Sequence, residues 1–228
     1  MITPVELQVD LADDLGSVSA LLMRPPDAWL LYVLAHGAGA GMQHAFLGSI
    51  SGALAARGIA TLRFQFPYME AGRRSPDSPR IAEATVAAAV GKAAALAPEL
   101  PLVAGGKSFG GRMTSGAAAS GLLPQVQGLV FLGFPLHPPG QPGTRRADHL
   151  DQIDLPMLFL QGTRDQFAQL DLISEVCGRL GAGATLQLID GGDHSFGVPK
   201  RSGRTPADVL AQLVASIAEW SRSRVLNR

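Results

Sequence analysis

The sequence predicts an α/β fold in which helices cover both faces of a mostly parallel sheet. Short apolar runs end in glycine or a polar residue, as buried strands do, and longer alanine- and leucine-rich stretches with helical spacing separate them. This alternation is typical of parallel strands joined by helices. A chain of 228 residues is also long enough to bury one substantial core, so we expect one domain over residues 1–228.

The first two predicted strands form an antiparallel hairpin at one edge of the sheet. Residues Val5–Asp10 and Val18–Arg24 show the alternation of apolar and polar residues that strands with one solvated face have. Asp13-Asp14-Leu15-Gly16 lies between them and is a turn signal.

The other strands have the length of central strands, and helices lie between them, which gives about eight strands in total. The predicted strands are Leu30–Ala35, Ala60–Phe66, Leu102–Gly105, Val126–Phe131, Pro156–Leu160 and Thr185–Ile189. The predicted helices are Gln43–Arg57, Pro79–Ala97, Phe109–Ser120, Gln169–Leu180 and Thr205–Arg222. In the last of them, a capping threonine precedes a proline at the first helical position. Residues Pro135–Leu155, with four prolines and two glycines, predict a loop with one short helix and no lid domain.

Charge and composition exclude several function classes. The 19 Lys and Arg residues balance the 19 Asp and Glu residues, so the chain has no electrostatic footprint for nucleic acid or an anionic membrane. The single cysteine, Cys177, excludes an internal disulfide and is expected to be a buried thiol. The N-terminus lacks the basic and apolar regions of a signal peptide, and the longest apolar run, Ala28 to Ala35, is too short to span a bilayer. We expect a cytoplasmic protein.

A G-x-S-x-G motif, GKSFG at residues 106–110, follows a predicted strand and precedes an alanine-rich helix. This is the context of a nucleophile at a tight turn between strand and helix. The serine has a strained backbone there, so the residues two positions on either side must lack side chains. Ser108 would lie at a helix N-terminus, where free N–H groups and the helix dipole favour developing negative charge.

Two phosphate-binding interpretations fail on their spacing. A Walker loop needs a glycine five positions before Gly106, where the sequence has Pro101. The glycines of residues 37–41 do not form a dinucleotide motif, because Met42 or His44 occupies its last position in either register. We therefore expect no nucleotide, and no other cofactor or metal.

A serine nucleophile needs a base, and the base needs a buried acid to orient it. On a sheet of this kind the acid and the base follow the serine, each on a loop after a later strand. Asp165 lies just past the strand that ends at Leu160, and His194 lies in the loop after Ile189. Asp190 remains the alternative acid.

The other candidates for acid and base are less well placed. Asp193 is adjacent to His194, and neighbouring side chains on an extended loop diverge. The other histidines precede the serine or lie in irregular segments without a strand end before them: His36, His44, His137 and His149.

The negative charge of the reaction also needs preorganised N–H donors. One is expected from Phe109, which follows the nucleophile, and one from the loop after the third strand, HGAGAG at residues 36–41. Glycine lets this backbone turn inward and a substrate approach closely. We expect the second donor to be the amide of Ala38, with Gly39 as the alternative.

Five ordered motifs, HGAGAG, RFQFPY, GGKSFGGRM, GTRDQF and GDHSF, make the chain resemble the α/β-hydrolase superfamily. The resemblance runs from about Val5 to Trp220 and is greatest to small lid-less bacterial hydrolases related to dienelactone hydrolase, grouped with testis-expressed and chromatin-complex subunit homologues of animals. It implies the α/β-hydrolase fold and a serine hydrolase with Ser108, Asp165 and His194 as its triad. Dienelactone hydrolases proper have a cysteine where this chain has Ser108, so dienelactone is not the expected substrate.

The expected activity is hydrolysis of a small-molecule ester or thioester through an acyl-enzyme. The alternative is a non-catalytic binding module that keeps the fold. The residues expected to contact substrate are Gly37, Tyr68, Phe134, Leu136, Phe167 and Phe196. Tyr68 is also a candidate for anchoring a loop. The oligomeric state cannot be read from the sequence.

Overall fold

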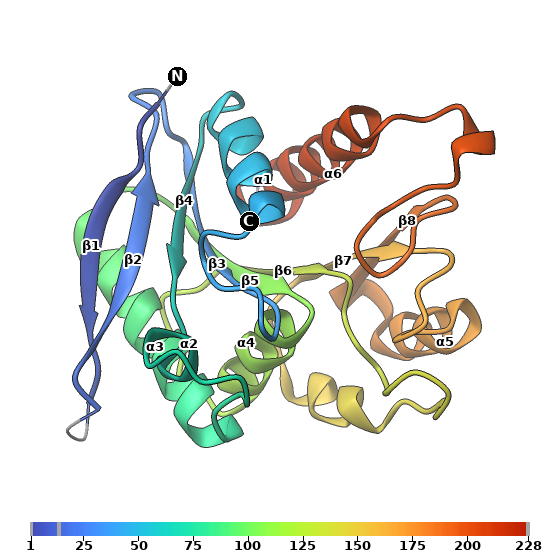
Figure 1. The fold of residues 1–228 in the computed structure, drawn as a ribbon, viewed down its shortest axis with the longest axis horizontal. Helices are drawn as coiled ribbons and strands as arrows, with labels where there is room; N and C mark the ends of the chain where they lie inside the picture. The colour runs from blue at the N-terminus through green and yellow to red at the C-terminus, as the bar shows by residue number, and fades with distance from the viewer. Residues whose placement is uncertain (1, 13–14, 227–228) are drawn as a thin grey trace.

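The computed structural model describes residues 2–12 and 15–226, in which eight strands form one sheet (Figure 1). The strands are β1 (Val5–Asp10), β2 (Ser17–Met23), β3 (Leu30–Ala35), β4 (Ile59–Phe64), β5 (Leu102–Lys107), β6 (Gly128–Leu132), β7 (Met157–Gly162) and β8 (Ala184–Ile189). Their order in the sheet is β1-β2-β4-β3-β5-β6-β7-β8. The two pairs that involve β2 are antiparallel and all others are parallel, which confirms the predicted fold class and edge hairpin. Asp13 and Asp14 of the predicted turn lie outside the described residues.

Helices cover both faces of the sheet (Figure 1). The α-helices are α1 (Ala45–Ala55), α2 (Pro67–Glu70), α3 (Pro79–Leu96), α4 (Phe109–Ala119), α5 (Leu170–Leu180) and α6 (Pro206–Ser221). The 3₁₀-helices are η1 (Arg145–Gln152), η2 (Gly181–Gly183) and η3 (Lys200–Ser202), and a π-helix, η4 (Arg222–Leu226), ends the described chain. Apolar side chains of α1 and α6 pack on one face, and those of α3, α4 and α5 pack on the other. None of the described helices combines the length and apolarity needed to cross a bilayer.

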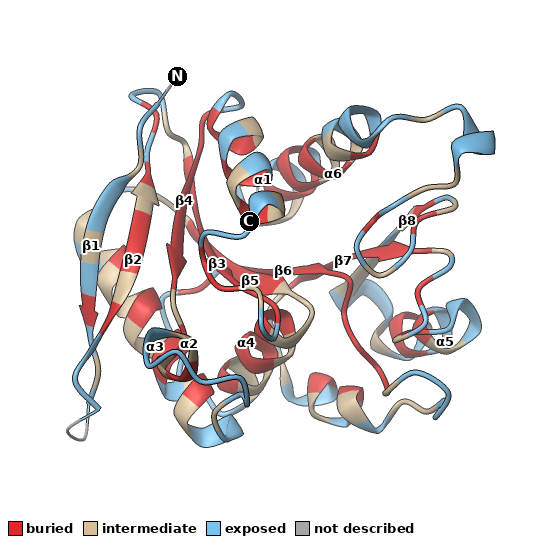
Figure 2. Cartoon of the chain, viewed as in Figure 1, coloured by how far each residue is buried: buried red, intermediate tan, exposed pale blue. Residues whose placement is uncertain are grey.

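The core lies on both sides of the central strands (Figure 2). Every residue of β3 is buried, and because side chains alternate along a strand, Leu31 and Val33 join one core while Leu30 and Leu34 join the other. A strand buried on both faces needs an unbroken apolar run, which is the pattern that predicted these strands. Cys177 is buried as expected, and burial raises the pKa of its thiol to about 12.

One expected element boundary is corrected and one is confirmed, each at a polar contact. The predicted strand 60–66 ends at Phe64, because the Phe66 N–H donates to His36 Nε2 at 3.1 Å and Pro67 begins the short helix α2, which was not predicted. The predicted cap of the last helix is present: Thr205 Oγ1 accepts from the Asp208 N–H, and the Asp208 carboxylate accepts from the Thr205 N–H.

The chain between β6 and β7 holds one short helix, η1, as predicted. Within the described residues this segment does not form a separate lid domain. The ends of β3, β5, β7 and β8 therefore carry their loops to a shared edge of the sheet, which positions the candidate site.

Candidate active site

Ser108 stands alone between β5 and α4, in a backbone conformation that is rare for a residue with a side chain. Its φ is 51° and its ψ is −114°. Such a conformation costs on the order of 1–3 kcal/mol and persists only where its surroundings impose it. The hydroxyl is thereby presented at the N-terminus of α4, where the first N–H groups of the helix have no intrahelical acceptor.

The glycines on either side of Ser108 are sterically required, as the motif predicted. A Cβ on Gly106 would lie 2.3 Å from the Ala35 carbonyl oxygen, and one on Gly110 would lie 2.6 Å from that of His36. Both distances are impossible for real atoms, so the turn packs backbone against backbone on β3. Ser108 is thus held close to the loop that follows β3.

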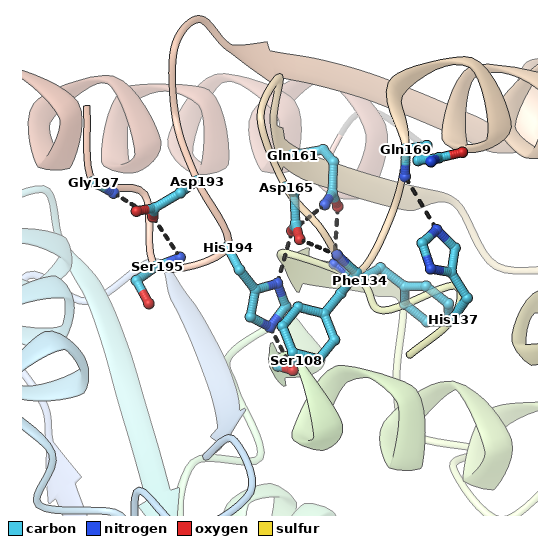
Figure 3. Close-up of polar contacts among 11 residues, drawn as sticks. Ser108, Phe134, His137, Gln161, Asp165, Gln169, Asp193, His194, Ser195 and Gly197 are labelled. Carbon is cyan, nitrogen blue, oxygen red and sulfur yellow. Dashed lines mark hydrogen bonds and ion pairs between the residues drawn. The ribbon is translucent and has the colours of Figure 1, made fainter. Parts of the chain in front are cut away.

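The structure brings Ser108, His194 and Asp165 into one hydrogen-bonded series (Figure 3). His194 Nε2 lies 2.8 Å from Ser108 Oγ, and His194 Nδ1 lies 2.7 Å from Asp165 Oδ2. A carboxylate only accepts, so Nδ1 carries the proton and Nε2 is free to accept from the serine hydroxyl. The Asp165 side chain is 1% exposed, whereas that of His194 is 20% exposed and reaches the surface.

Two further donors fix the orientation of the Asp165 carboxylate. Gln161 Nε2 donates to Oδ2 at 2.6 Å, and the Phe167 N–H donates to Oδ1 at 2.8 Å. Gln161 is itself held by the Phe134 N–H, which donates to its Oε1 at 2.9 Å. A buried carboxylate with its oxygens satisfied in this way holds the imidazole in one tautomer and one orientation.

Neither of the other two aspartates near His194 forms a hydrogen bond with the imidazole among the described residues. Asp193 Oδ1 accepts from the N–H groups of Ser195 and Gly197, both at 2.8 Å, and so shapes its own turn. Asp190 is exposed, and its backbone carbonyl accepts from Arg204. The contacts to the imidazole therefore favour Asp165 over the alternative acid.

A second serine–histidine contact joins Ser115 to His149, with Ser115 Oγ 2.7 Å from His149 Nε2. Ser115 lies within α4, and its hydroxyl donates to the Arg112 carbonyl at 2.9 Å. Its single proton is therefore used, and the hydroxyl accepts from the imidazole. This geometry is that of a side chain bracing a helix, and Ser115 lacks the strained backbone that Ser108 has.

The glycine loop 36–41 is anchored by the rings of His36 and Tyr68. His36 is buried, with Nδ1 2.8 Å from the Gly37 carbonyl and Nε2 accepting from Phe66. Burial lowers the pKa of His36 to about 4, against a weaker opposing effect of the Gly37 carbonyl, so the ring is neutral. The Tyr68 hydroxyl accepts from the Gly39 N–H at 2.9 Å, which supports the loop-anchoring interpretation of Tyr68.

This anchoring distinguishes the two candidate oxyanion donors of the loop, the amides of Ala38 and Gly39. The Gly39 amide is used by Tyr68, whereas the Ala38 amide makes no hydrogen bond with any residue that the structure describes. Gly37 lies against the turn of Ser108, because a Cβ on it would be 3.8 Å from Ser108 Cβ. Phe109 begins α4, and its N–H has no partner among the described residues.

The apolar residues expected at the substrate divide into three groups. Phe167 stacks on the His194 ring at 4.2 Å between centroids, beside the site. Phe134 is 1% exposed and packs on Phe131 and Phe159, so it belongs to the core and does not line a wall, contrary to expectation. Leu136 lines a hollow between α3, α4 and η1, and Phe196 lines another hollow between α1 and α6.

Sequence reasoning missed Gln161 and Lys107. Gln161 is the polar residue at the end of a buried strand, and that contrast with its apolar neighbours was the available signal. Lys107 occupies a freely variable position of the motif, so nothing marked it. Its ammonium group is buried without a hydrogen-bond partner among the described residues and lies 5.6 Å from the Phe196 ring centre. Burial lowers the pKa of Lys107 to about 8, although Asp165 and Asp193 oppose this shift.

Solved structures similar to this chain share its fold over nearly their full length. A lid-less α/β serine hydrolase of Xanthomonas campestris is 21% identical, with a TM-score of 0.73 over 96% of this chain and 95% of that chain. A dienelactone hydrolase of Anabaena variabilis is 19% identical, with a TM-score of 0.76 over 97% and 99%. A serine hydrolase homologue of Coxiella burnetii is 17% identical, with a TM-score of 0.74 over 95% and 99%.

At these identities the similarities establish the architecture, and the family follows from the sequence match. The model of the family described as an alpha/beta hydrolase domain matches residues 28–222, which include Ser108, Asp165 and His194. The chain therefore belongs to the alpha/beta hydrolase domain family.

Proposed function

We propose that this chain is a serine hydrolase that cleaves carboxylic esters or thioesters, with Ser108 as nucleophile, His194 as base and Asp165 as the orienting acid. The observation that carries the proposal is the hydrogen-bonded series from Ser108 Oγ through His194 to a buried Asp165, beginning at a strained serine. Residues 1–228 would act as one domain. The sequence resemblance to lid-less dienelactone-hydrolase-like proteins, grouped with testis-expressed and chromatin-complex subunit homologues, agrees with this activity.

The proposed reaction has two steps. As Ser108 Oγ attacks the carbonyl carbon, His194 Nε2 takes the hydroxyl proton and then gives it to the departing alcohol or thiol, so the bond to the leaving group breaks. In the second step His194 takes a proton from water and the resulting hydroxide attacks the acyl carbon. The bond from that carbon to Ser108 Oγ then breaks, His194 returns the proton to Oγ, and the carboxylic acid leaves. Asp165 keeps the imidazole oriented and stabilises its positive charge in both steps.

The developing oxyanion would be bound by the amides of Ala38 and Phe109. Both N–H groups are unpaired among the described residues, and both belong to segments that border Ser108. The N-terminus of α4 adds its dipole at the same point. Tyr68 and His36 would act as positioning residues, because they fix the loop that carries Ala38.

Labelling with a fluorophosphonate probe tests this proposal against a binding module without turnover. The wild-type protein should be labelled and Ser108→Ala should not. Ser115→Ala is the matched control, because Ser115 also contacts a histidine, and it should be labelled like the wild type. A wild-type protein that stays unlabelled, or a Ser108→Ala variant that is labelled equally, would overturn the assignment.

The assignment of the acid is tested by two aspartate variants. Asp165→Asn should lower ester turnover by a factor on the order of 10⁴, because the amide stabilises the wrong tautomer of the imidazole. Asp190→Asn removes the alternative acid and should retain most of the activity. The opposite pattern would transfer the role to Asp190.

A further inference from the structure

A hollow of about 850 Å³ lies between α3, α4 and the segment that follows β6. Its walls carry polar groups from three separate elements. Glu83 comes from α3, Arg112 from α4, and Arg145, Arg146 and His149 from η1, with Leu136 between them. The hollow therefore exists only because the fold brings these elements together.

The charge in this hollow is unbalanced. Across residues 2–12 and 15–226, none of its three arginine side chains forms an ion pair within 4 Å or a hydrogen bond. Glu83, the acidic residue of the lining, is drawn against α4: a Cβ on Gly116 would lie 2.3 Å from Glu83 Oε1. Three guanidinium groups thus face one carboxylate.

Arg112 and Arg146 line the same hollow and carry like charges. Burial lowers the pKa of Arg112, the charge of Arg146 lowers it further, and Glu83 opposes both effects. Holding two half-buried guanidinium groups together costs free energy unless an anion lies between them. Carboxylate and phosphate groups match the planar fork of arginine, which can donate two parallel hydrogen bonds to either.

His149 contributes an uncharged wall to the hollow. Burial and the charge of Arg112 lower the pKa of His149, while Asp148 opposes them. The ring is held by Ser115, whose own proton goes to the Arg112 carbonyl. This contact braces η1 against α4 and so keeps Arg146 opposite Arg112.

The hollow begins one helical turn from the proposed nucleophile. The Arg112 N–H donates to the Ser108 carbonyl at 3.1 Å, and four residues of α-helix advance about 6 Å along the axis. The segment that carries Leu136 leaves β6 beside Ser108, because the Ser108 N–H donates to the Leu132 carbonyl at 3.1 Å. The first turn of α4 therefore joins Ser108 to one wall of the hollow.

We propose that this hollow binds an anionic group of the substrate, so that the esters cleaved at Ser108 carry a carboxylate or phosphate several carbons from the reacting carbonyl. This inference rests on the proposed function. Arg112 and Arg146 would bind the anion directly, and the length of the hollow would select how far it lies from the ester.

A matched pair of esters tests the inference. p-Nitrophenyl hydrogen adipate carries a carboxylate four methylenes from the ester carbonyl, and p-nitrophenyl 6-methylheptanoate carries an isopropyl group of similar shape in its place. The wild type should show a higher kcat/KM for the adipate ester. In Arg112→Gln and in Arg146→Gln the ratio of the two kcat/KM values should fall by roughly 10- to 100-fold, the effect of one charge-assisted hydrogen bond. Arg80→Gln, an exposed arginine of α3 outside the hollow, should keep the wild-type ratio.

Anion binding without turnover separates this inference from the proposed function. In Ser108→Ala, adipate or inorganic phosphate at constant ionic strength should raise the midpoint of thermal unfolding, and adding Arg146→Gln should abolish the rise. A rise with only one of the two anions would support the inference and identify the anionic group. Cleavage of both esters with equal efficiency, together with no rise from either anion, would overturn the inference and leave the hydrolase assignment standing. Failure to cleave either ester, with anion binding intact, would instead remove the proposed function.

Discussion

The buried His36 predicts a marked loss of stability in mild acid. Both of its ring nitrogens are used by the neutral form, since Nδ1–H donates to the Gly37 carbonyl and Nε2 accepts from the Phe66 N–H. Adding a proton would break the second bond and bury a charge. Burial accordingly lowers the pKa from 6.5 to about 4.

The sign and size of the effect follow from proton linkage. Between pH 6.5 and about 4 the unfolded chain binds a proton at His36 and the folded chain does not, so the free energy of unfolding falls as the pH falls through this window. Each tenfold change in proton affinity is worth about 1.4 kcal/mol, so the full loss is about 3 kcal/mol. That is a large share of the roughly 5–15 kcal/mol by which proteins are stable.

Urea unfolding of the wild type and His36→Gln between pH 4 and pH 7.5 measures the contribution of His36 to the free energy of unfolding. Glutamine keeps an acceptor for the Phe66 N–H but cannot titrate, so the difference in unfolding free energy between the two proteins should change by about 3 kcal/mol in favour of the variant as the pH falls to 4. A wild-type to His36→Gln difference that is the same at pH 7.5 and pH 4 would refute the reasoning.

Three further predictions concern residues around the site. Between pH 8 and 10.5 the unfolded chain holds the Lys107 proton and the folded chain does not. As the pH rises through this window, the unfolding free energy of the wild type should therefore increase by about 3 kcal/mol relative to that of Lys107→Met, as measured by urea titration. A difference that stays constant with pH would contradict the buried charge. Tyr68→Phe removes the acceptor of a loop N–H and should cost about 1–3 kcal/mol in thermal unfolding, and an unchanged midpoint would show that the bond contributes nothing. Gly133→Ala would place a Cβ 3.1 Å from Lys107 Nζ and 3.4 Å from the His194 carbonyl oxygen, and the shift this requires should lower ester turnover. Gly140→Ala, with a similar positive φ but open space, should lose only stability; equal activity in the two would exclude the steric effect.

Much of the architecture could be predicted because strands buried on both faces need unbroken apolar runs. The same rule explains where prediction stopped. Phe64 and Phe66 are equally apolar, but the second gives its N–H to His36 instead of a neighbouring strand, and this contact between distant segments leaves no periodic signal. Helix α2 has only four residues, too few to show a helical period, and it was therefore not predicted.

The proposed triad could be predicted because chain order and strand ends restrict each role to very few residues. Surrounding groups were less accessible. Phe134 follows a strand end, as a wall residue would, yet its ring turns inward onto Phe131, and only packing decides between the two directions. The arginine hollow has no sequence signature, because Glu83, Arg112 and Arg146 become neighbours through the packing of α3, α4 and η1.

The proposed base, His194, lies in the loop after β8, which is an edge strand of the sheet. Among the residues that the structure describes, this strand pairs only with β7. Ile189 is its one buried residue, whereas every residue of β7 is buried. Hydrogen bonds at such an edge are broken by local fluctuations that leave the rest of the fold intact. Warming should therefore detach the imidazole from Ser108 before the central strands separate. Inactivation would then be an early and reversible event, which refolding of a single strand can undo.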